Sequence, residues 1–261
     1  MLPQNLPILN YHKIDNKPDV GITTRHPDDF MKDLAILKQQ GFNSINFKHL
    51  KENKLPKKPV LISFDDAYES FYSEAFPILK EFQMTAVVFV PVNFIGKFNT
   101  WDVQIGRKKY RHMNESQLIE ISKSGFEIGS HSLTHRSLTF LDEKSLISEI
   151  KTSKEVLQDI TGENIISFSY PFGLLNNRVI KYVQEHYAYA VQLIKFKQQL
   201  NGTSLYSIPR INIYRMDSEK AFIKKLDFRN NTGLVFKNKL IQSGSWATVL
   251  LQQFKNFNRY N

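Results

Sequence analysis

Two adjacent aspartates, Asp65 and Asp66, follow an apolar run that ends at Phe64, and they are the residues of this chain best suited to chemistry. Neighbouring side chains on a strand point to opposite faces, so both carboxylates can serve one site only if the chain turns there. Two carboxylates this close also repel each other, and a cation between them relieves that repulsion. The pair therefore predicts a metal site. Alternatively, Asp66 could cap a following helix, with Glu69 completing a capping box.

Two histidines supply further candidate ligands. His131 and His135, in the stretch His131-Ser-Leu-Thr-His135, are four residues apart, and side chains with that spacing on one helical turn face the same way. Asp66 with two imidazoles gives three protein ligands, and zinc is the usual ion for such a mixed nitrogen and oxygen site. The same ligands also describe the facial triad of non-haem iron oxygenases. The extra aspartate, Asp65, favours hydrolysis because it supplies a base beside the metal.

Three further side chains lie at the ends of expected strands. His12 could protonate a leaving amine, or it could be a structural histidine. The segment Ser169-Tyr-Pro-Phe-Gly173 forms a tight turn, which could aim the Tyr170 N–H at an oxyanion or simply end the strand. Arg210 could keep Asp65 ionised, or it could form a surface ion pair of little energetic consequence.

The chain alternates apolar runs with helical patterns. Strands are expected at 7–11, 42–47, 60–64, 85–90, 126–129, 165–170, 188–193 and 207–213. Helices are expected from residue 28 to Gly41, at 68–82 with a break at Pro77, and at 115–123, 142–160 and 178–185. Repeated strand–helix units with apolar strands predict an α/β fold with a parallel sheet that closes into an irregular barrel. A parallel barrel carries its chemistry at the carboxyl ends of its strands, where the polar residues above fall.

Bulk composition sets the class of protein. The 261 residues suit one large domain or two small ones, and no apolar run approaches the roughly 18–20 residues that span a bilayer. Residues 1–6 lack a signal-peptide pattern, so we expect either a cytosolic protein or one whose leader is missing from the given sequence. The absence of cysteine excludes disulfides and thiolate ligands. We expect residues 1–216 to form one domain and residues 217–261 a basic extension.

The net charge of +10 is unevenly placed. The last 43 residues, 219–261, carry eight Lys or Arg against two acids. Such a tail could rest on an anionic cell wall or membrane surface, or it could be a solvated segment. No nucleic-acid-binding motif accompanies the charge, so nucleic acid is not an expected partner.

Three motifs together resemble those of the polysaccharide deacetylase family, which is the NodB-homology domain or carbohydrate esterase family four. They are, in order, Ser63-Phe-Asp-Asp66, His131-Ser-Leu-Thr-His135 and Ser169-Tyr-Pro-Phe-Gly173. The resemblance covers residues 6–216 and implies a distorted (β/α) barrel of about seven parallel strands. It also implies a metal-dependent removal of acetyl groups from N-acetylated sugars. Asn10-Tyr-His-Lys-Ile14 resembles the branch that deacetylates poly-β-1,6-N-acetylglucosamine in biofilms.

The resemblance also implies a role for each matching residue. Asp65 would be the base, and Tyr170 would offer its amide to the oxyanion. Asp66, His131 and His135 would bind the metal, which would be Zn²⁺ or another divalent transition metal such as Co²⁺ or Ni²⁺.

The sequence departs from the family pattern at two places, and each departure assigns a role to a residue outside the three motifs. The third motif usually carries an arginine and here has none, so Arg210 is expected to substitute for it. The late Leu-x-His motif is also absent, since no histidine follows His186. The general acid is therefore placed on His12, because the first and last strands of a closed barrel are neighbours.

The expected protein is thus a polysaccharide N-deacetylase that acts on polymeric N-acetylglucosamine. Peptidoglycan or chitin-like oligomers are the alternative substrates, and a non-catalytic glycan-binding surface protein is the alternative function. We expect an extracellular or cell-surface location, with the cytoplasm as the alternative. Trp101, in a long polar loop, could stack on a sugar or pack locally.

Overall fold

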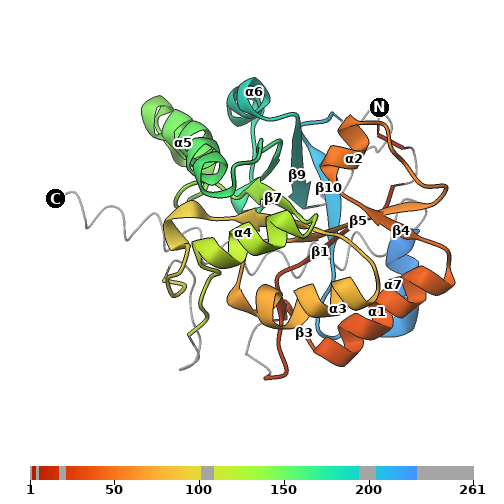
Figure 1. Cartoon of the computed structure of the whole chain (residues 1–261). Coiled ribbons are helices and arrows are strands. Elements are labelled where there is room, and N and C mark those ends of the chain that lie inside the picture. The colour runs from red at the N-terminus through yellow and green to blue at the C-terminus, as the bar shows by residue number, and fades with distance from the viewer. Residues whose placement is uncertain (1, 4–5, 18–21, 101–108, 194–203, 228–261) are drawn as a thin grey trace.

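A closed barrel of parallel strands forms the centre of the protein. The computed structural model describes residues 2–3, 6–17, 22–100, 109–193 and 204–227. The seven barrel strands are β1 (Ile8–Tyr11), β5 (Pro59–Phe64), β6 (Val87–Val90), β7 (Glu127–Ser130), β8 (Ser167–Ser169), β9 (Tyr189–Leu193) and β10 (Ile208–Asn212). They pair in the order β1-β10-β9-β8-β7-β6-β5, and β1 pairs again with β5 (Figure 1). The predicted distorted (β/α) barrel of about seven parallel strands is confirmed.

Three short strands lie outside this ring. β4 (Asn43–Ile45) pairs with the first half of β5, while β2 (Lys13–Ile14) and β3 (Thr24–Arg25) form a separate pair. All of these pairings are parallel as well.

Helices cover the outside of the barrel (Figure 1). They are α1 (Pro27–Gln39), α2 (Phe47–Lys51), α3 (Phe76–Glu81), α4 (Glu115–Lys123), α5 (Glu143–Thr161), α6 (Asn177–His186) and α7 (Glu219–Leu226). In the described part of the chain a π-turn, η1 (Phe71–Ala75), precedes α3, and the 3₁₀ turns are η2 (Val92–Phe94), η3 (Leu138–Phe140) and η4 (Pro171–Gly173). Within the described ranges, none of the helices combines the length and apolar character needed to cross a bilayer.

The helix signals in the sequence hold where a cap accompanies the periodicity. α4 spans the predicted residues, with Asn114 and Gln117 forming a capping box. The break expected at Pro77 in the 68–82 helix is not observed: Ala75 and Phe76 both have right-handed helical angles, so the π-turn η1 runs directly into α3, with Pro77 in the first turn of α3. The five-residue helix α2 was not predicted, since it is too short to show a period.

Buried apolar residues form two clusters, one on each face of the barrel sheet. The larger cluster lies between strands and helices and includes Leu9, Ile62 and Phe64. The smaller cluster includes Ile8 and Leu61, which are register partners. Because successive side chains alternate between faces, this second set fills the barrel interior.

The described part of the basic extension packs on the barrel. α7 lies against α1, with Phe222 buried (Figure 1). Lys225 is also buried and pairs with Asp217. Residues 228–261 lie outside the described residues, so a boundary at residue 216 stays a prediction.

Glu127 is a buried carboxyl inside the barrel, at the start of β7. It accepts hydrogen bonds from the Ser167 hydroxyl (2.6 Å) and the Lys48 N–H (3.1 Å). Burial raises the pKa of Glu127 to about 7, although these hydrogen bonds favour its charged form. An acid whose pKa is raised on folding stabilises the fold while it is protonated, and that stabilisation is lost as the pH rises through about 7.

Replacing Glu127 with Gln should therefore remove a pH dependence. The free energy of unfolding of wild type minus that of Glu127→Gln should fall by about 2–3 kcal/mol between about pH 5 and 8. Asp33, whose pKa burial raises to about 6, is present in both proteins and cancels. Urea titrations at several pH values would measure this, with the exposed Glu155→Gln as control. A constant difference would show that Glu127 is ionised in the fold.

Candidate active site

The two aspartates are separated by a left-handed turn. Asp65 continues the β5 ladder, its N–H donating to the Tyr11 carbonyl (3.0 Å). Asp66 and Ala67 then have φ angles of 71° and 49°, so the chain turns where the sequence required it. The capping alternative for Asp66 is not observed, because the Glu69 N–H donates to the Arg111 carbonyl (2.8 Å) instead.

Asp66, His131 and His135 form a buried cluster at the carboxyl ends of β5 and β7. Asp66 Oδ1 lies 3.3 Å from His135 Nε2 and 3.6 Å from His131 Nε2, and the two Nε2 atoms are 3.1 Å apart. Tetrahedral ligands of zinc at about 2.0–2.1 Å are separated by about 3.3 Å. Asp66 Oδ1 is also buried and receives no hydrogen bond of ordinary geometry from the described residues. The cluster thus fits a metal ion.

The protonation states of this cluster suit a metal. Burial lowers the pKa of His131 to about 4, so its imidazole is neutral. His131 Nδ1 lies 2.7 Å from the Ser169 carbonyl, which can only accept, so Nδ1 carries the hydrogen and Nε2 is the free ligand atom. Burial opposes the charge of Asp66, but His135 beside it holds the pKa of that carboxyl at about 2. A carboxylate and a neutral imidazole are the forms that bind metals.

The two histidines do not share a helical turn, which corrects the interpretation of their spacing. Their segment is a loop in which Ser132 and His135 are left-handed, with φ angles of 65° and 55°. The Ser132 hydroxyl accepts the His135 N–H (3.1 Å), which closes the loop on itself. The side chains converge because of this loop.

Asp65 sits in a separate hydrogen-bond network. Both Arg210 terminal nitrogens donate to it, at 2.9 and 2.7 Å, and the Ser169 hydroxyl (3.1 Å) and Asn10 amide (3.0 Å) complete four bonds. Burial alone would raise the pKa of Asp65, but the Arg210 guanidinium, with His131 nearby, holds the pKa of this carboxyl well below its usual range. The expected contact between Arg210 and Asp65 is present, and it is buried.

The orientation of Asn10 is fixed by its partners. Its oxygen accepts from Arg210 (2.6 Å) and Ser63 (3.0 Å), and its amide group donates to Asp65 and to Asn212 (2.9 Å). A guanidinium can only donate, so the amide cannot be turned round. Sequence reasoning gave Asn10 no role, although its place two residues before His12 at a strand end was a usable signal.

His12 directly follows β1. Its Nδ1 is buried and has no hydrogen-bond partner among the described residues. Burial lowers the pKa of His12, while Asp66 and Asp65 act in the opposite direction, which places both aspartates within electrostatic range of the ring.

The structure corrects the expected role of Tyr170. Its N–H donates to the Val191 carbonyl (3.2 Å) in the pairing of β8 with β9, and its hydroxyl donates to the Tyr206 carbonyl (2.8 Å). Both donors are therefore committed to the fold rather than to an oxyanion. Besides the Ser169 carbonyl, Phe172 of this turn contacts the cluster, its ring packing edge-on against His135 at a centroid distance of 4.8 Å.

His112 is a buried residue that sequence reasoning missed. Its Nδ1 lies 2.6 Å from the Asp66 carbonyl, to which it must donate. The Met113 N–H donates to the Ala67 carbonyl (2.9 Å), so the 112–113 segment supports both left-handed residues of the aspartate turn. Nothing in the local sequence connects these positions, because an antiparallel bridge between His112 and Tyr68 brings them together.

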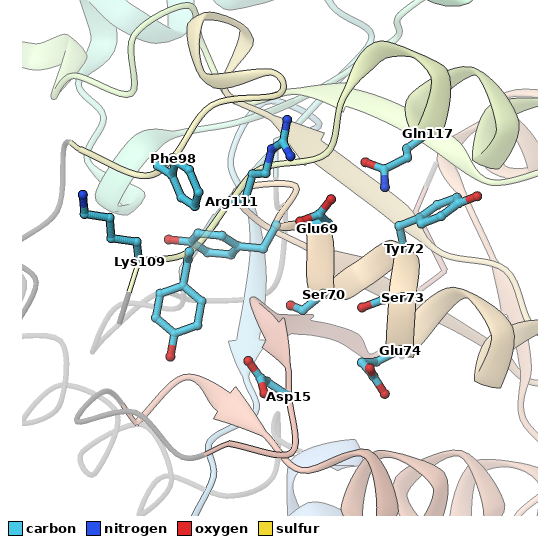
Figure 2. Close-up of a pocket in the computed structure, with 12 residues that line it drawn as sticks. Asp15, Glu69, Ser70, Tyr72, Ser73, Glu74, Phe98, Lys109, Arg111 and Gln117 are labelled. Carbon is cyan, nitrogen blue, oxygen red and sulfur yellow. The ribbon is translucent and has the colours of Figure 1, made fainter. Parts of the chain in front are cut away.

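A pocket of about 640 Å³ lies beside the aspartate turn. Figure 2 shows Phe98 and Lys109 on one side of it, and Glu69, Ser70 and Glu74 on the η1 side. The aromatic and acidic residues of its lining are Tyr68, Tyr72, Phe98, Tyr110, Asp15, Glu69 and Glu74. Trp101, the aromatic singled out in the sequence, lies outside the described residues.

Comparisons with known proteins agree with the motifs. The polysaccharide deacetylase family model matches residues 52–191. The Bacillus subtilis protein named "Putative polysaccharide deacetylase YxkH" is 32% identical over 184 residues, which is 69% of this chain and 61% of that protein. A poly-beta-1,6-N-acetyl-D-glucosamine N-deacetylase of Staphylococcus epidermidis is 26% identical over 245 residues, 84% of this chain and 82% of that protein.

A solved structure has the same fold. The crystal structure of a polysaccharide deacetylase from Bacillus cereus superimposes with a TM-score of 0.73 at 24% identity, covering 85% of this chain and 68% of that one. The barrel carries, at the ends of its strands, a buried Asp-His-His cluster that could hold a metal ion. The chain belongs to the polysaccharide deacetylase family, and the resemblance found in its motifs is confirmed.

The buried pair of Asp65 and Arg210 yields a stability prediction. Arg210→Met would leave the Asp65 carboxylate buried without its cation, which should cost about 3–5 kcal/mol of unfolding free energy. Lys32→Met, at the exposed pair with Asp29, should cost less than about 1 kcal/mol. Urea unfolding of both variants would compare them. Equal losses would show that the Asp65 network contributes no more than a surface ion pair.

Proposed function

We propose that the chain is a metal-dependent N-deacetylase of a polymer of N-acetylglucosamine, with poly-β-1,6-N-acetylglucosamine as its substrate and zinc as its metal. The observation that carries this proposal is the buried cluster of Asp66, His131 and His135 beside the ionised Asp65. The name of the Staphylococcus epidermidis relative supports the choice of polymer. Since that polymer belongs to the biofilm matrix, we place the protein outside the cell or at its surface.

The proposed reaction is hydrolysis of an acetamide. A divalent metal held by the cluster would polarise the acetamide carbonyl and lower the pKa of an attacking water. Asp65 takes a proton from that water while the water oxygen forms its bond to the carbonyl carbon. The carboxylate already accepts four hydrogen bonds, and the one from the Ser169 hydroxyl is the easiest to exchange, because a hydroxyl rotates.

The second half of the reaction needs an acid. When the carbon–nitrogen bond breaks, the sugar nitrogen must gain a proton, and the products are acetate and a free amine. We assign this role to His12, whose buried Nδ1 has no hydrogen-bond partner in the described part of the chain. Burial lowers the pKa of His12, so its imidazole is neutral at rest. The proton that it passes to the sugar nitrogen is balanced by the one that Asp65 takes from the attacking water.

The direct test compares linkages. Purified protein with zinc should release acetate and free amines from β-1,6-linked N-acetylglucosamine oligomers faster than from β-1,4-linked ones, and chelation should abolish both. Faster reaction with the β-1,4-linked oligomers would shift the substrate to chitin-like or peptidoglycan chains. Retention on the polymer without acetate release would indicate a glycan-binding protein instead.

Asp65→Asn separates catalysis from metal binding. The variant keeps the shape of the side chain but cannot take a proton, so kcat should fall by about 10²–10⁴-fold. Zinc should still bind, because the proposed ligand residues Asp66, His131 and His135 are all retained. Steady-state kinetics and zinc titration would measure the two effects, with thermal unfolding as a check of the fold. Turnover near that of wild type would remove Asp65 from the reaction.

The pocket beside the aspartate turn is a candidate site for neighbouring sugars of the chain. It includes Tyr68, two residues after Asp66, and the half-exposed ring of Phe98. Aromatic faces provide apolar contact at low entropic cost. Phe98→Ala should raise KM by about 2- to 10-fold for long oligomers and leave the shortest substrate unaffected. Ile223→Ala, on the exposed face of α7, is the control. An equal effect on all chain lengths would exclude the pocket.

A further inference from the structure

The loop between His131 and His135 requires support from outside itself. It has no regular structure, and two of its residues are in the left-handed region, which is costly for residues other than glycine. Such a loop keeps two imidazole nitrogens 3.1 Å apart only if the surrounding structure holds its backbone.

Glu149 on α5 supplies that support. Its Oε2 accepts the Leu133 N–H (2.9 Å) and the Thr134 N–H (2.8 Å), and its Oε1 accepts the Thr134 hydroxyl. The carboxylate is buried, with the residue 5% exposed. One side chain thus binds three donors in the middle of the loop, between the two candidate ligands.

The helix that carries Glu149 is itself fixed. Leu146, Ile150 and Leu157 place α5 in the core. Ser153, four residues after Glu149, receives a hydrogen bond from the Ser130 hydroxyl (2.8 Å), and Ser130 directly precedes His131. The helix is therefore hydrogen-bonded to the strand end from which the loop starts. The positions of the Glu149 carboxylate and of His131 are thus fixed relative to each other.

We propose that Glu149 is a positioning residue for the metal site, which holds the loop so that His131 and His135 point at one ion. This inference rests on the proposed function, since it assumes that the cluster binds a metal. It assigns to an acid outside the cluster the task of setting the geometry of two ligands. Supporting residues that orient metal ligands typically change metal affinity or activity by about 10- to 100-fold when they are removed.

Three variants test the proposal. Glu149→Ala removes all three acceptor contacts and should weaken zinc binding by about 10- to 100-fold. Glu149→Gln should stay within about 3-fold of wild type, because its carbonyl can accept both N–H groups and its amide can donate to the Thr134 hydroxyl. Glu155→Ala, exposed on the same helix, should have no effect.

Zinc affinity would be measured by competition with a chelator, and the absorption spectrum of the Co²⁺ form would report ligand geometry. A Glu149→Ala protein that binds zinc within about 2-fold of wild type, with an unchanged Co²⁺ spectrum, overturns the proposal. If Glu149→Ala does not fold, Glu149→Asp decides in the same way, because its carboxylate is one methylene too short to reach both N–H groups. A wild-type protein that binds no zinc would instead refute the proposed function.

Discussion

Two adjacent buried carboxylates are the constraint on which this structure depends. An unpaired buried charge is costly, and two neighbouring ones repel each other, so each needs its own cation. The left-handed turn at Asp66 and Ala67 separates them. Asp65 is directed into the barrel, where Arg210 binds it through two nitrogens. Asp66 is directed to the histidine loop, where an ion bound by His131 and His135 could offset its charge. One change of backbone direction thus creates a buried ion pair and a candidate ligand site from neighbouring residues.

The barrel interior is divided so that this polar network lies at one end only. On β1 and β5, Ile8 pairs with Leu61 in the apolar layer. Two residues further along both strands, Asn10 pairs with Ser63 in the polar layer. The inward positions of the same strands therefore change from apolar to polar toward their carboxyl ends. The apolar layer excludes water on the side of the polar groups that faces the amino ends of the strands. Close packing leaves the polar side chains little conformational freedom. Donors fixed in this way need no reorganisation when charge develops next to them.

The candidate ligands and the barrel could be predicted from the sequence, but the contacts that hold the candidate ligands in place could not. Asp66, His131 and His135 could be found because a metal needs a recognisable set of residue types, and strand–helix alternation predicts a parallel barrel. The histidine spacing was nevertheless assigned to a helical turn, since the left-handed conformation of a non-glycine residue leaves no local signal. His112 and Glu149 were missed for a related reason. His112 contacts the Asp66 carbonyl 46 residues away in the chain, and Glu149 contacts Leu133 and Thr134 from 16 and 15 residues away.

The charge balance of the site connects these parts to the proposed chemistry. Asp65 and Arg210 cancel, His131 is neutral, and Asp66 contributes a single negative charge. A divalent ion in such a set keeps a net positive charge, which suits the negative charge that develops on a carbonyl oxygen under attack. If Arg210 did not neutralise Asp65, a second carboxylate would lie beside the ion and weaken this attraction. The arginine therefore contributes to the electrostatics of the metal site without touching any of its ligands, because it decides how many anions the ion meets.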